Sequence, residues 1–83
     1  MKILYFAWLR ERLNRGEETI DPPADIATVS DLMDWLAASD EGIDLVFENR
    51  DLIRVAVDDE LVEHDETIAG AETVAFFPPM TGG

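Results

Sequence analysis

The 83-residue sequence contains no cysteine and only one histidine, His64. Without cysteine the chain has no disulfide, no thiolate metal site and no cysteine nucleophile, so it cannot carry sulfur as a cysteine persulfide. One histidine cannot build a metal cluster without carboxylate ligands. His64 lies between Glu63 and Asp65, where we expect a solvated loop residue. We therefore expect no metal and no cofactor bound directly to this chain.

A catalytic serine is also not indicated. Ser30 and Ser39 would allow a Ser-His-Asp set by count, but no nucleophile elbow surrounds either of them. We therefore do not expect the chain to be a catalyst on its own.

Long apolar runs are missing too. No segment approaches the roughly 20 apolar residues that a membrane-spanning helix needs. The apolar start at residues 1–8 is followed by Arg10 and Arg12, and no small-residue cleavage site comes after it, so a signal peptide is not indicated. These features predict a cytosolic protein.

Basic residues are scarce. Lys and Arg together number 6 against 19 Asp and Glu, which gives a formal charge of −13. Residues 55–83 hold seven acidic residues and no basic one. Such a surface repels nucleic acid and anionic membranes. The charge fits solubility or the acidic proteome of a salty organism. It equally fits steering toward a basic partner, at an association rate that falls with salt, and composition leaves these interpretations open.

The length suits one compact domain spanning residues 1–83. Residues 2–7 predict a buried strand, and residues 8–13 a short helix with Leu9 and Leu13 on one face. Gly16 is then expected to break the helix before a second strand at 17–21. Pro22 and Pro23 end that strand, because proline cannot donate to a sheet.

The main helix is predicted to begin after Thr28, whose hydroxyl can cap it. Because the Asp31 side chain is shorter than the glutamate of a capping box, we expect only the Thr28 half of that motif. The helix ends at residues 40–42, and residues 43–47 form a short apolar return. Its buried stripe consists of Val29, Leu32, Met33 and Leu36.

The remaining pattern predicts strands at 52–57, 61–62 and 73–77, with turns at 58–59 and 70–72. Two strands, a helix and two or three further strands are typical of the ubiquitin-like β-grasp arrangement, an α+β class in which one main helix packs on one face of a mixed sheet. We expect the first and last strands to lie side by side in the middle, since both are strongly apolar.

The C-terminal segment carries the chemistry. Pro78 and Pro79 cannot continue a sheet ladder and predict an extended, flexible tail at 78–83. Gly82 and Gly83 lack a Cβ, so the tip can enter a narrow channel. A terminal carboxylate delivered into a buried site can be activated as an acyl-adenylate and converted to a thiocarboxylate, which requires no cysteine.

Residues 76–83, Phe-Phe-Pro-Pro-Met-Thr-Gly-Gly, resemble the C-terminal signature of molybdopterin synthase small subunits, and the likeness extends over the whole chain. The departures are Ala71, Met80 and the 58–59 turn, none of which affects the terminal glycines. The resemblance implies that a ubiquitin-activating-type adenylyltransferase uses ATP to adenylate Gly83, which a sulfur donor protein then thiocarboxylates.

The resemblance also implies a partner that completes the catalyst. The tail would enter the large subunit of molybdopterin synthase, which holds the catalytic residues, and donate sulfur to cyclic pyranopterin monophosphate. Two transfers would build the dithiolene, within a heterotetramer of two small and two large subunits. Phe76 and Phe77 must point to opposite faces of their strand, one into the core and one toward the partner. The predicted partner-binding residues are Phe76, Phe77, Pro78, Pro79, Met80, Thr81 and Gly82.

Three other functions fit the same tail. The chain can be a sulfur carrier for thiamine synthesis or tRNA thiolation, which uses the same terminal chemistry. It can be a ubiquitin-like modifier whose Gly83 forms isopeptide bonds with lysines of other proteins. It can also be a β-grasp interaction module in which the two terminal glycines have no role.

Overall fold

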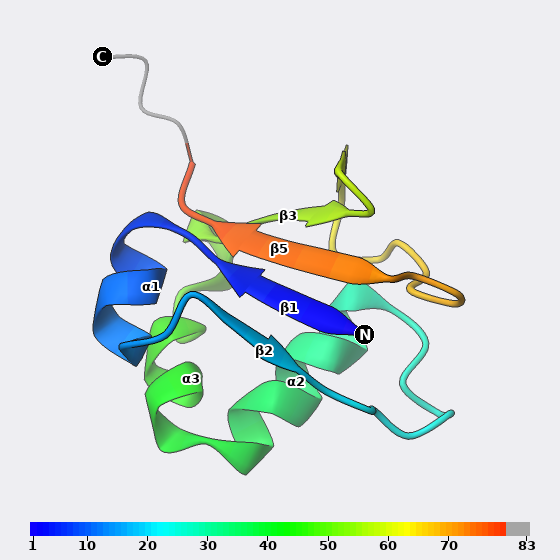
Figure 1. Ribbon diagram of the computed structural model, residues 1–83, viewed down its shortest axis with the longest axis horizontal. Coiled ribbons are helices and arrows are strands. Elements are labelled where there is room, and N and C mark those ends of the chain that lie inside the picture. The colour runs from blue at the N-terminus through cyan, green and yellow to red at the C-terminus, as the bar shows by residue number, and fades with distance from the viewer. Residues whose placement is uncertain (80–83) are drawn as a thin grey trace.

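A single mixed sheet organises the chain in the computed structural model, which describes residues 1–79 (Figure 1). The strand order is β2-β1-β5-β3-β4. The strands are β1 Lys2–Tyr5, β2 Glu17–Thr19, β3 Arg54–Val57, β4 Glu60–Val62 and β5 Thr73–Phe77. β1 and β5 pair in parallel at the centre, while the other neighbours are antiparallel. The predicted ubiquitin-like β-grasp fold of the α+β class is confirmed, as are the central first and last strands.

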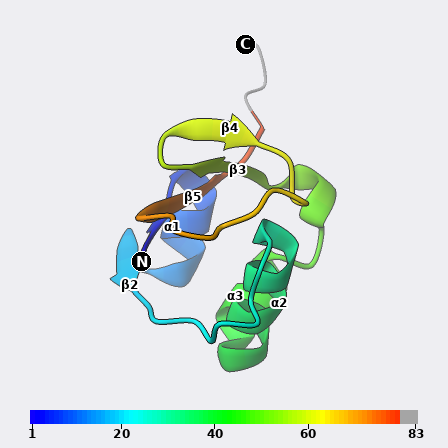
Figure 2. The ribbon, with the colours of Figure 1, turned by 90° about the vertical axis from the view of Figure 1, so that its right-hand side faces the viewer.

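The main helix is α2, Val29–Ser39, which lies on one side of the sheet together with α3, Glu41–Val46 (Figure 2). Its predicted apolar stripe is fully buried. The capping box is complete, because Thr28 Oγ1 accepts from Asp31 N at 3.1 Å and Asp31 Oδ2 accepts from Thr28 N at 3.2 Å. The expectation that only the Thr28 half would form is therefore wrong: the Asp31 carboxylate reaches back far enough to accept from Ala27 N as well.

The end of the first strand and the residue that turns the chain after the first helix differ from the sequence prediction. The predicted strand 2–7 ends at Tyr5, because Ala7 has φ +55° and begins helix α1, Ala7–Leu13. That helix ends at Leu13, as predicted, but the residue that turns the chain is its C-cap Asn14, which adopts φ +56°, and not Gly16. Asn tolerates the left-handed region through its short polar side chain, so the chain turns two residues before the glycine.

The apolar return at 43–47 is mostly helical. Asp40 ends α2 and also caps α3, because its Oδ1 accepts from Gly42 N at 2.8 Å and Ile43 N at 3.3 Å. A 3₁₀ turn, η1 at Arg50–Leu52, then precedes β3, so the strand predicted at 52–57 starts at Arg54. β2 likewise ends at Thr19, two residues before the predicted boundary.

The core lies between the sheet and the helices, with Phe76 of β5 near its centre. The Phe76 ring lies 5.0 Å from that of Phe47 and 6.3 Å from that of Tyr5, measured between ring centroids. Burial raises the pKa of the Tyr5 phenol far above its ordinary value, and its hydroxyl donates to Glu18 Oε2 at 2.6 Å. Arg15 pairs with Glu18 at 3.2 Å and Asp40 at 2.9 Å, which ties the sheet to the α2–α3 junction.

Candidate functional site

β5 presents its two phenylalanines to opposite sides of the sheet. Val74 and Phe76 face the helices and are 0% exposed, whereas Phe77 is half-buried and points the other way. The Phe76 side chain is therefore part of the core, and its predicted partner-binding role is wrong. Phe77 occupies the side expected of a partner contact, and that role stays a prediction.

The side of the sheet opposite α2 carries an apolar strip. Strand register places Leu61 beside Ala56, Ala56 beside Ala75, and Ala75 beside Leu4 in one row across four strands. Leu61 is 69% exposed. Phe6, directly after the end of β1 and two residues along the chain from Leu4, is 48% exposed. We call this surface the outer face; its apolar members are Leu4, Phe6, Ala56, Leu61, Ala75 and Phe77. An exposed apolar strip of this kind is typical of a protein-binding surface.

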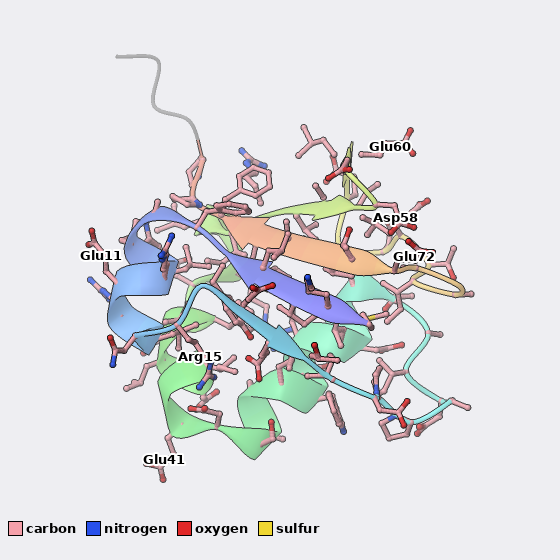
Figure 3. All side chains as sticks on the ribbon, in the orientation of Figure 1. Glu11, Arg15, Glu41, Asp58, Glu60 and Glu72 are labelled. Atoms are coloured by element: carbon pink, nitrogen blue, oxygen red, sulfur yellow. The ribbon has the colours of Figure 1, made fainter. Side chains whose placement is uncertain are left out.

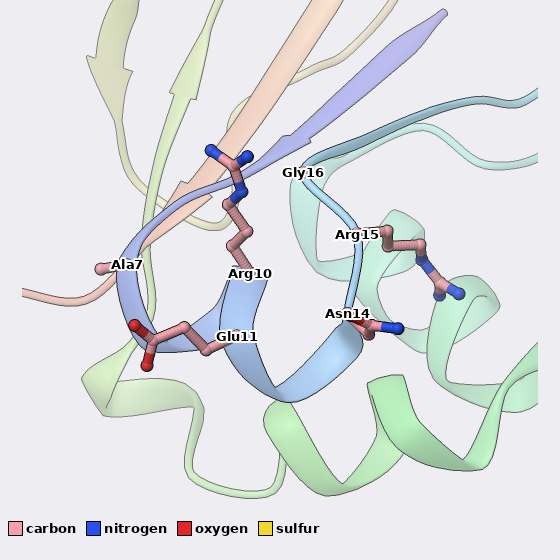
Figure 4. A pocket seen from close by; sticks show the side chains of 6 residues that line it. All are labelled: Ala7, Arg10, Glu11, Asn14, Arg15 and Gly16. Carbon is pink, nitrogen blue, oxygen red and sulfur yellow. The ribbon is translucent and has the colours of Figure 1, made fainter.

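Basic side chains border the outer face. Arg54 is exposed and pairs across the sheet with Phe77. Arg10 extends from α1 toward β1, whereas Arg15 points in the other direction, toward the helices (Figure 4). An open pocket of about 540 Å³ lies between these two arginines. Lys2 pairs with Glu17 at 3.2 Å. The outer face is thus apolar at its centre, with charged side chains of both signs at its edge, since Glu17 lies beside Leu4.

The C-terminal tail leaves the sheet beside this strip. Phe6 N donates to Phe76 O at 3.1 Å, and Phe77 pairs with Arg54 of β3 as the last residue of β5. Pro78 and Pro79 follow without backbone donors. Met80, Thr81, Gly82 and Gly83 lie outside the described residues, so the roles predicted for them remain predictions from the sequence.

The β3–β4 hairpin lies at the end of the sheet opposite the tail exit. Asp58 and Asp59 have φ +49° and +69°, as a tight two-residue hairpin turn requires, which confirms the predicted turn. Asp58 Oδ1 accepts from Glu72 N and Thr73 N, each at 2.9 Å, and Figure 3 shows Asp58 and Glu72 side by side. These hydrogen bonds, led by that from Thr73, lower the pKa of the Asp58 carboxyl. They hold the start of β5.

His64 is not the freely solvated residue that its acidic neighbours suggest. The side chain is half-buried, and its Nε2 lies 2.9 Å from Ile53 O. Its partner is a backbone carbonyl, so the contact is structural. Within residues 1–79 no group of three or more His, Asp or Glu side chains is placed to hold a metal ion. In the same part of the chain no helix combines the length and apolarity needed to cross a membrane.

Sequence reasoning identified the tail but missed Phe6, Leu61 and Arg54. The alternation that separates Phe76 from Phe77 also separates Leu4 from its buried neighbours, and this signal was available in the sequence. The row from Leu61 to Leu4, however, depends on which strands are neighbours. Only the register shows that they form one surface beside the tail exit.

These features define a β-grasp protein that places an apolar sheet face next to the exit of its C-terminal segment. The model of the ThiS family matches residues 3–83, and the chain belongs to that family. It is 37% identical to the molybdopterin synthase sulfur carrier subunit of Escherichia coli over 83 residues, which cover 100% of this chain and 99% of the relative. The subunit of the same name from Haemophilus influenzae is 31% identical, with the same coverage.

A solved structure has the same fold. Small archaeal modifier protein 1 of Haloferax volcanii superposes with a TM-score of 0.73 at 26% identity, and the match covers 95% of each chain. The likeness supports the β-grasp assignment. The solved structure is named as a modifier, whereas the two relatives above are named as sulfur carriers.

Proposed function

We propose that this chain is a sulfur carrier in molybdopterin synthesis and that Gly83 is the carrier position. The observation that carries the proposal is the Gly82-Gly83 terminus, which follows the Pro78-Pro79 exit beside the outer face in a ThiS-family chain. Whole-length similarity to two molybdopterin synthase sulfur carrier subunits supports the choice of pathway. The absence of cysteine requires that any carried sulfur be bound elsewhere, and a C-terminal thiocarboxylate meets that requirement.

The proposed chemistry has two activation steps and one transfer. The Gly83 carboxylate attacks the α-phosphorus of ATP on a ubiquitin-activating-type enzyme, forming the glycyl adenylate and releasing pyrophosphate. A hydrosulfide equivalent from a sulfur donor protein then attacks the acyl carbon and displaces AMP, which leaves the thiocarboxylate. The thiocarboxylate sulfur attacks a carbon of cyclic pyranopterin monophosphate and displaces an oxygen leaving group from that carbon. Water then cleaves the resulting thioester, which restores the Gly83 carboxylate and leaves the sulfur on the substrate. Because ATP is consumed, we propose the cytoplasm as the compartment.

The proposed partner for the transfer is the large subunit of molybdopterin synthase. The outer face offers it a hydrophobic docking surface centred on Phe77 and Leu61, and aromatic side chains in such positions often dominate binding energy. Docking there would place the tail exit against the partner, so residues 78–83 could enter its active site. The large subunit would supply the catalytic groups, in a heterotetramer of two small and two large subunits.

A protein modifier is the second candidate, favoured by the fold match to small archaeal modifier protein 1. A modifier would use the same glycyl adenylate but transfer the acyl group to a lysine amine, forming an isopeptide bond and releasing AMP. Immunoblots of tagged protein would then show conjugate ladders that vanish when Gly83 is deleted. Sulfur carriage for thiamine or tRNA thiolation would instead leave molybdoenzyme activity intact when the chain is removed.

The deciding measurement is the intact mass of the full chain purified from a cell that makes molybdenum cofactor. We expect a species heavier by the difference between sulfur and oxygen, localised to the C-terminal peptide. Deletion of Gly83 should abolish this species and molybdoenzyme activity while the unfolding transition stays unchanged. Only unmodified chain, even with activating enzyme, ATP and a sulfur donor supplied, would refute the carrier function.

A further inference from the structure

The six Lys and Arg residues of the chain differ in whether another side chain binds them. Three form ion pairs with carboxylates: Lys2, Arg15 and Arg50. A fourth, Arg12, lies over the Trp8 ring, with its Cζ 5.0 Å from the ring centroid. Within residues 1–79, Arg10 and Arg54 form neither an ion pair nor a contact with an aromatic ring. Although the chain has 19 Asp and Glu side chains, the two arginines that lack such a partner in the described part of the chain both border the outer face.

Arg54 lies beside the point at which the C-terminal segment leaves the sheet. It is the first residue of β3 and pairs in register with Phe77, the last residue of β5. Because the next residue, Val55, is fully buried on the helix side, the Arg54 side chain emerges on the outer face. Side chains directly opposite in an antiparallel pair have Cβ atoms about 4.5–5.5 Å apart, so Arg54 and Phe77 are neighbours. The arginine is therefore the cation closest in the sheet to the half-buried aromatic ring at the tail exit.

The carboxylates near Arg54 do not neutralise it. Asp51 and Glu63 line the same shallow pocket as Arg54, but within residues 1–79 neither forms an ion pair with it. Its exposed guanidinium keeps a planar fork of N–H donors, which matches a carboxylate through two parallel hydrogen bonds. A polyanion such as nucleic acid is repelled by the surrounding acidic surface. The ligand that fits is a single carboxylate next to an apolar surface, as a protein partner presents it.

We propose that Arg54 is a specificity-determining residue of the outer face, and that the large subunit docked there presents a carboxylate to it. The apolar strip supplies most of the binding energy, whereas the ion pair fixes the orientation in which the strip is covered. Because Arg54 is the neighbour of Phe77, this orientation places the tail exit at Pro78 against the partner. The proposal rests on the proposed function, which assigns the large subunit to this face.

Arg12 provides a matched control. Like Arg54 it is an exposed arginine, and replacing either residue by glutamine changes the net charge by the same single unit. Arg12 lies two positions after Arg10 on α1, and residues two apart on a helix project to nearly opposite sides. Since Arg10 extends toward β1 at the edge of the outer face (Figure 4), Arg12 points away from that edge. An effect of Arg54 that Arg12 does not share is therefore local.

The first measurement is the affinity of the full-length chain for the large subunit, obtained by calorimetry at low and high sodium chloride. We expect Arg54→Gln to bind about tenfold more weakly at low salt, and the difference from wild type to shrink as salt is added. Arg12→Gln should bind as wild type does, and the urea midpoint of both variants should be unchanged. Equal affinities of Arg54→Gln and Arg12→Gln would overturn the proposal.

The second measurement identifies the ligand. Lys2 is the only lysine, so Arg54→Lys adds one amine to a low background. In the complex, a water-soluble carbodiimide activates a partner carboxylate, the amine attacks its carbon, and an amide forms while the carbodiimide leaves as its urea. Mass spectrometry of the digested complex should join position 54 to an Asp or Glu of the large subunit, and Arg12→Lys should give no such product.

Three outcomes would count against the proposal. One is a complex in which position 54 couples to no carboxylate of the large subunit, or couples no better than position 12. Another is coupling to a second copy of this chain, which would assign the outer face to self-association. The third is a wild-type chain that does not bind the large subunit at all, which would refute the proposed partner and this contact together. A thiocarboxylate found by intact mass would in that case still establish the carrier function.

Discussion

Phe76 and Phe77 offer a matched pair of perturbations, because they are adjacent in sequence and lie on opposite sides of the sheet. Phe76 is fully buried against Tyr5 and Phe47. Phe77 is half-buried on the outer face, across from Arg54. We predict that Phe76→Ala destabilises the fold and that Phe77→Ala weakens partner binding. The same chemical change thus separates the two roles.

The expected magnitudes differ enough to be resolved. Removing a buried phenylalanine costs about 3–5 kcal/mol through lost transfer energy and a residual cavity. A domain of this size has a total stability of only about 4–12 kcal/mol, so Phe76→Ala leaves little margin, and Phe76→Leu is the milder companion at about 1–2 kcal/mol. Phe77→Ala should cost less than about 1 kcal/mol of folding stability. At a binding hot spot it should cost about 2 kcal/mol, or roughly 30-fold in affinity.

Urea unfolding followed by tryptophan fluorescence, with Trp8 and Trp35 as reporters, measures the folding cost. Isothermal calorimetry with the large subunit measures binding. The expected result is a lowered urea midpoint for both Phe76 variants, and weaker binding with a nearly unchanged midpoint for Phe77→Ala. Equal stability losses at the two positions would refute the assignment of faces. Unchanged affinity of Phe77→Ala would refute the outer face as the docking surface.

Two further predictions concern charge. The pKa of the Asp58 carboxyl is lowered in the folded state, so its contribution is fully present above the ordinary value of 3.8 and is lost as pH falls through the lower folded value. In urea titrations, the stability gap between wild type and Asp58→Asn should thus be widest above about pH 5 and should narrow below about pH 4; a gap independent of pH would contradict this. The net charge is −13, and only four of the 19 Asp and Glu side chains form ion pairs within residues 1–79, so repulsion between carboxylates should dominate surface electrostatics. Added sodium chloride should therefore raise the melting temperature, and a melting temperature that falls with salt would show that the ion pairs outweigh the repulsion.

Much of the fold was predictable because its signals are local. β5 is predicted at 73–77 and occurs at those residues, since a mostly apolar run is terminated there by two prolines. The start of α2 was equally clear from Thr28 and the apolar stripe that follows. Such elements are specified by residues within a few positions of their ends, so one sequence is sufficient to locate them.

The sequence predictions are wrong where tertiary contacts determine the backbone conformation. Phe6 and Ala7 read as continued strand, since no propensity predicts an alanine in the left-handed region. The sequence predicts Asp40 as part of the end of one helix, although its side chain also caps the next helix. The first error bears on the candidate site, because β1 ends before it reaches Phe77, which is left paired with β3 alone.

The candidate site likewise has features that the sequence predicts and features that it does not. The terminal glycines, the prolines and the opposite orientation of the two phenylalanines follow from local chemistry. The outer face does not, because Leu61 and Leu4 are 57 positions apart and share one row only through the register of β4, β3, β5 and β1. A single sequence does not specify which strands become neighbours in the sheet.

The distribution of charge bears on the two interpretations of the acidic composition. Exposed carboxylates of Asp34, Asp44 and Glu48 lie on or beside α2 and α3, on the side of the sheet away from the outer face. Carboxylates are not confined to that side, because Asp58, Asp59 and Glu60 are exposed in the β3–β4 hairpin, and Glu17 lies beside Leu4 in the strand register. Lys2, Arg10 and Arg54 border the outer face, and Lys2 is paired with Glu17. The negative charge is therefore spread over both sides of the sheet, so it would attract a basic partner without turning the tail exit toward it. Docking at the outer face would then depend on apolar contact, whereas the acidic composition would act on solubility and on the rate of encounter.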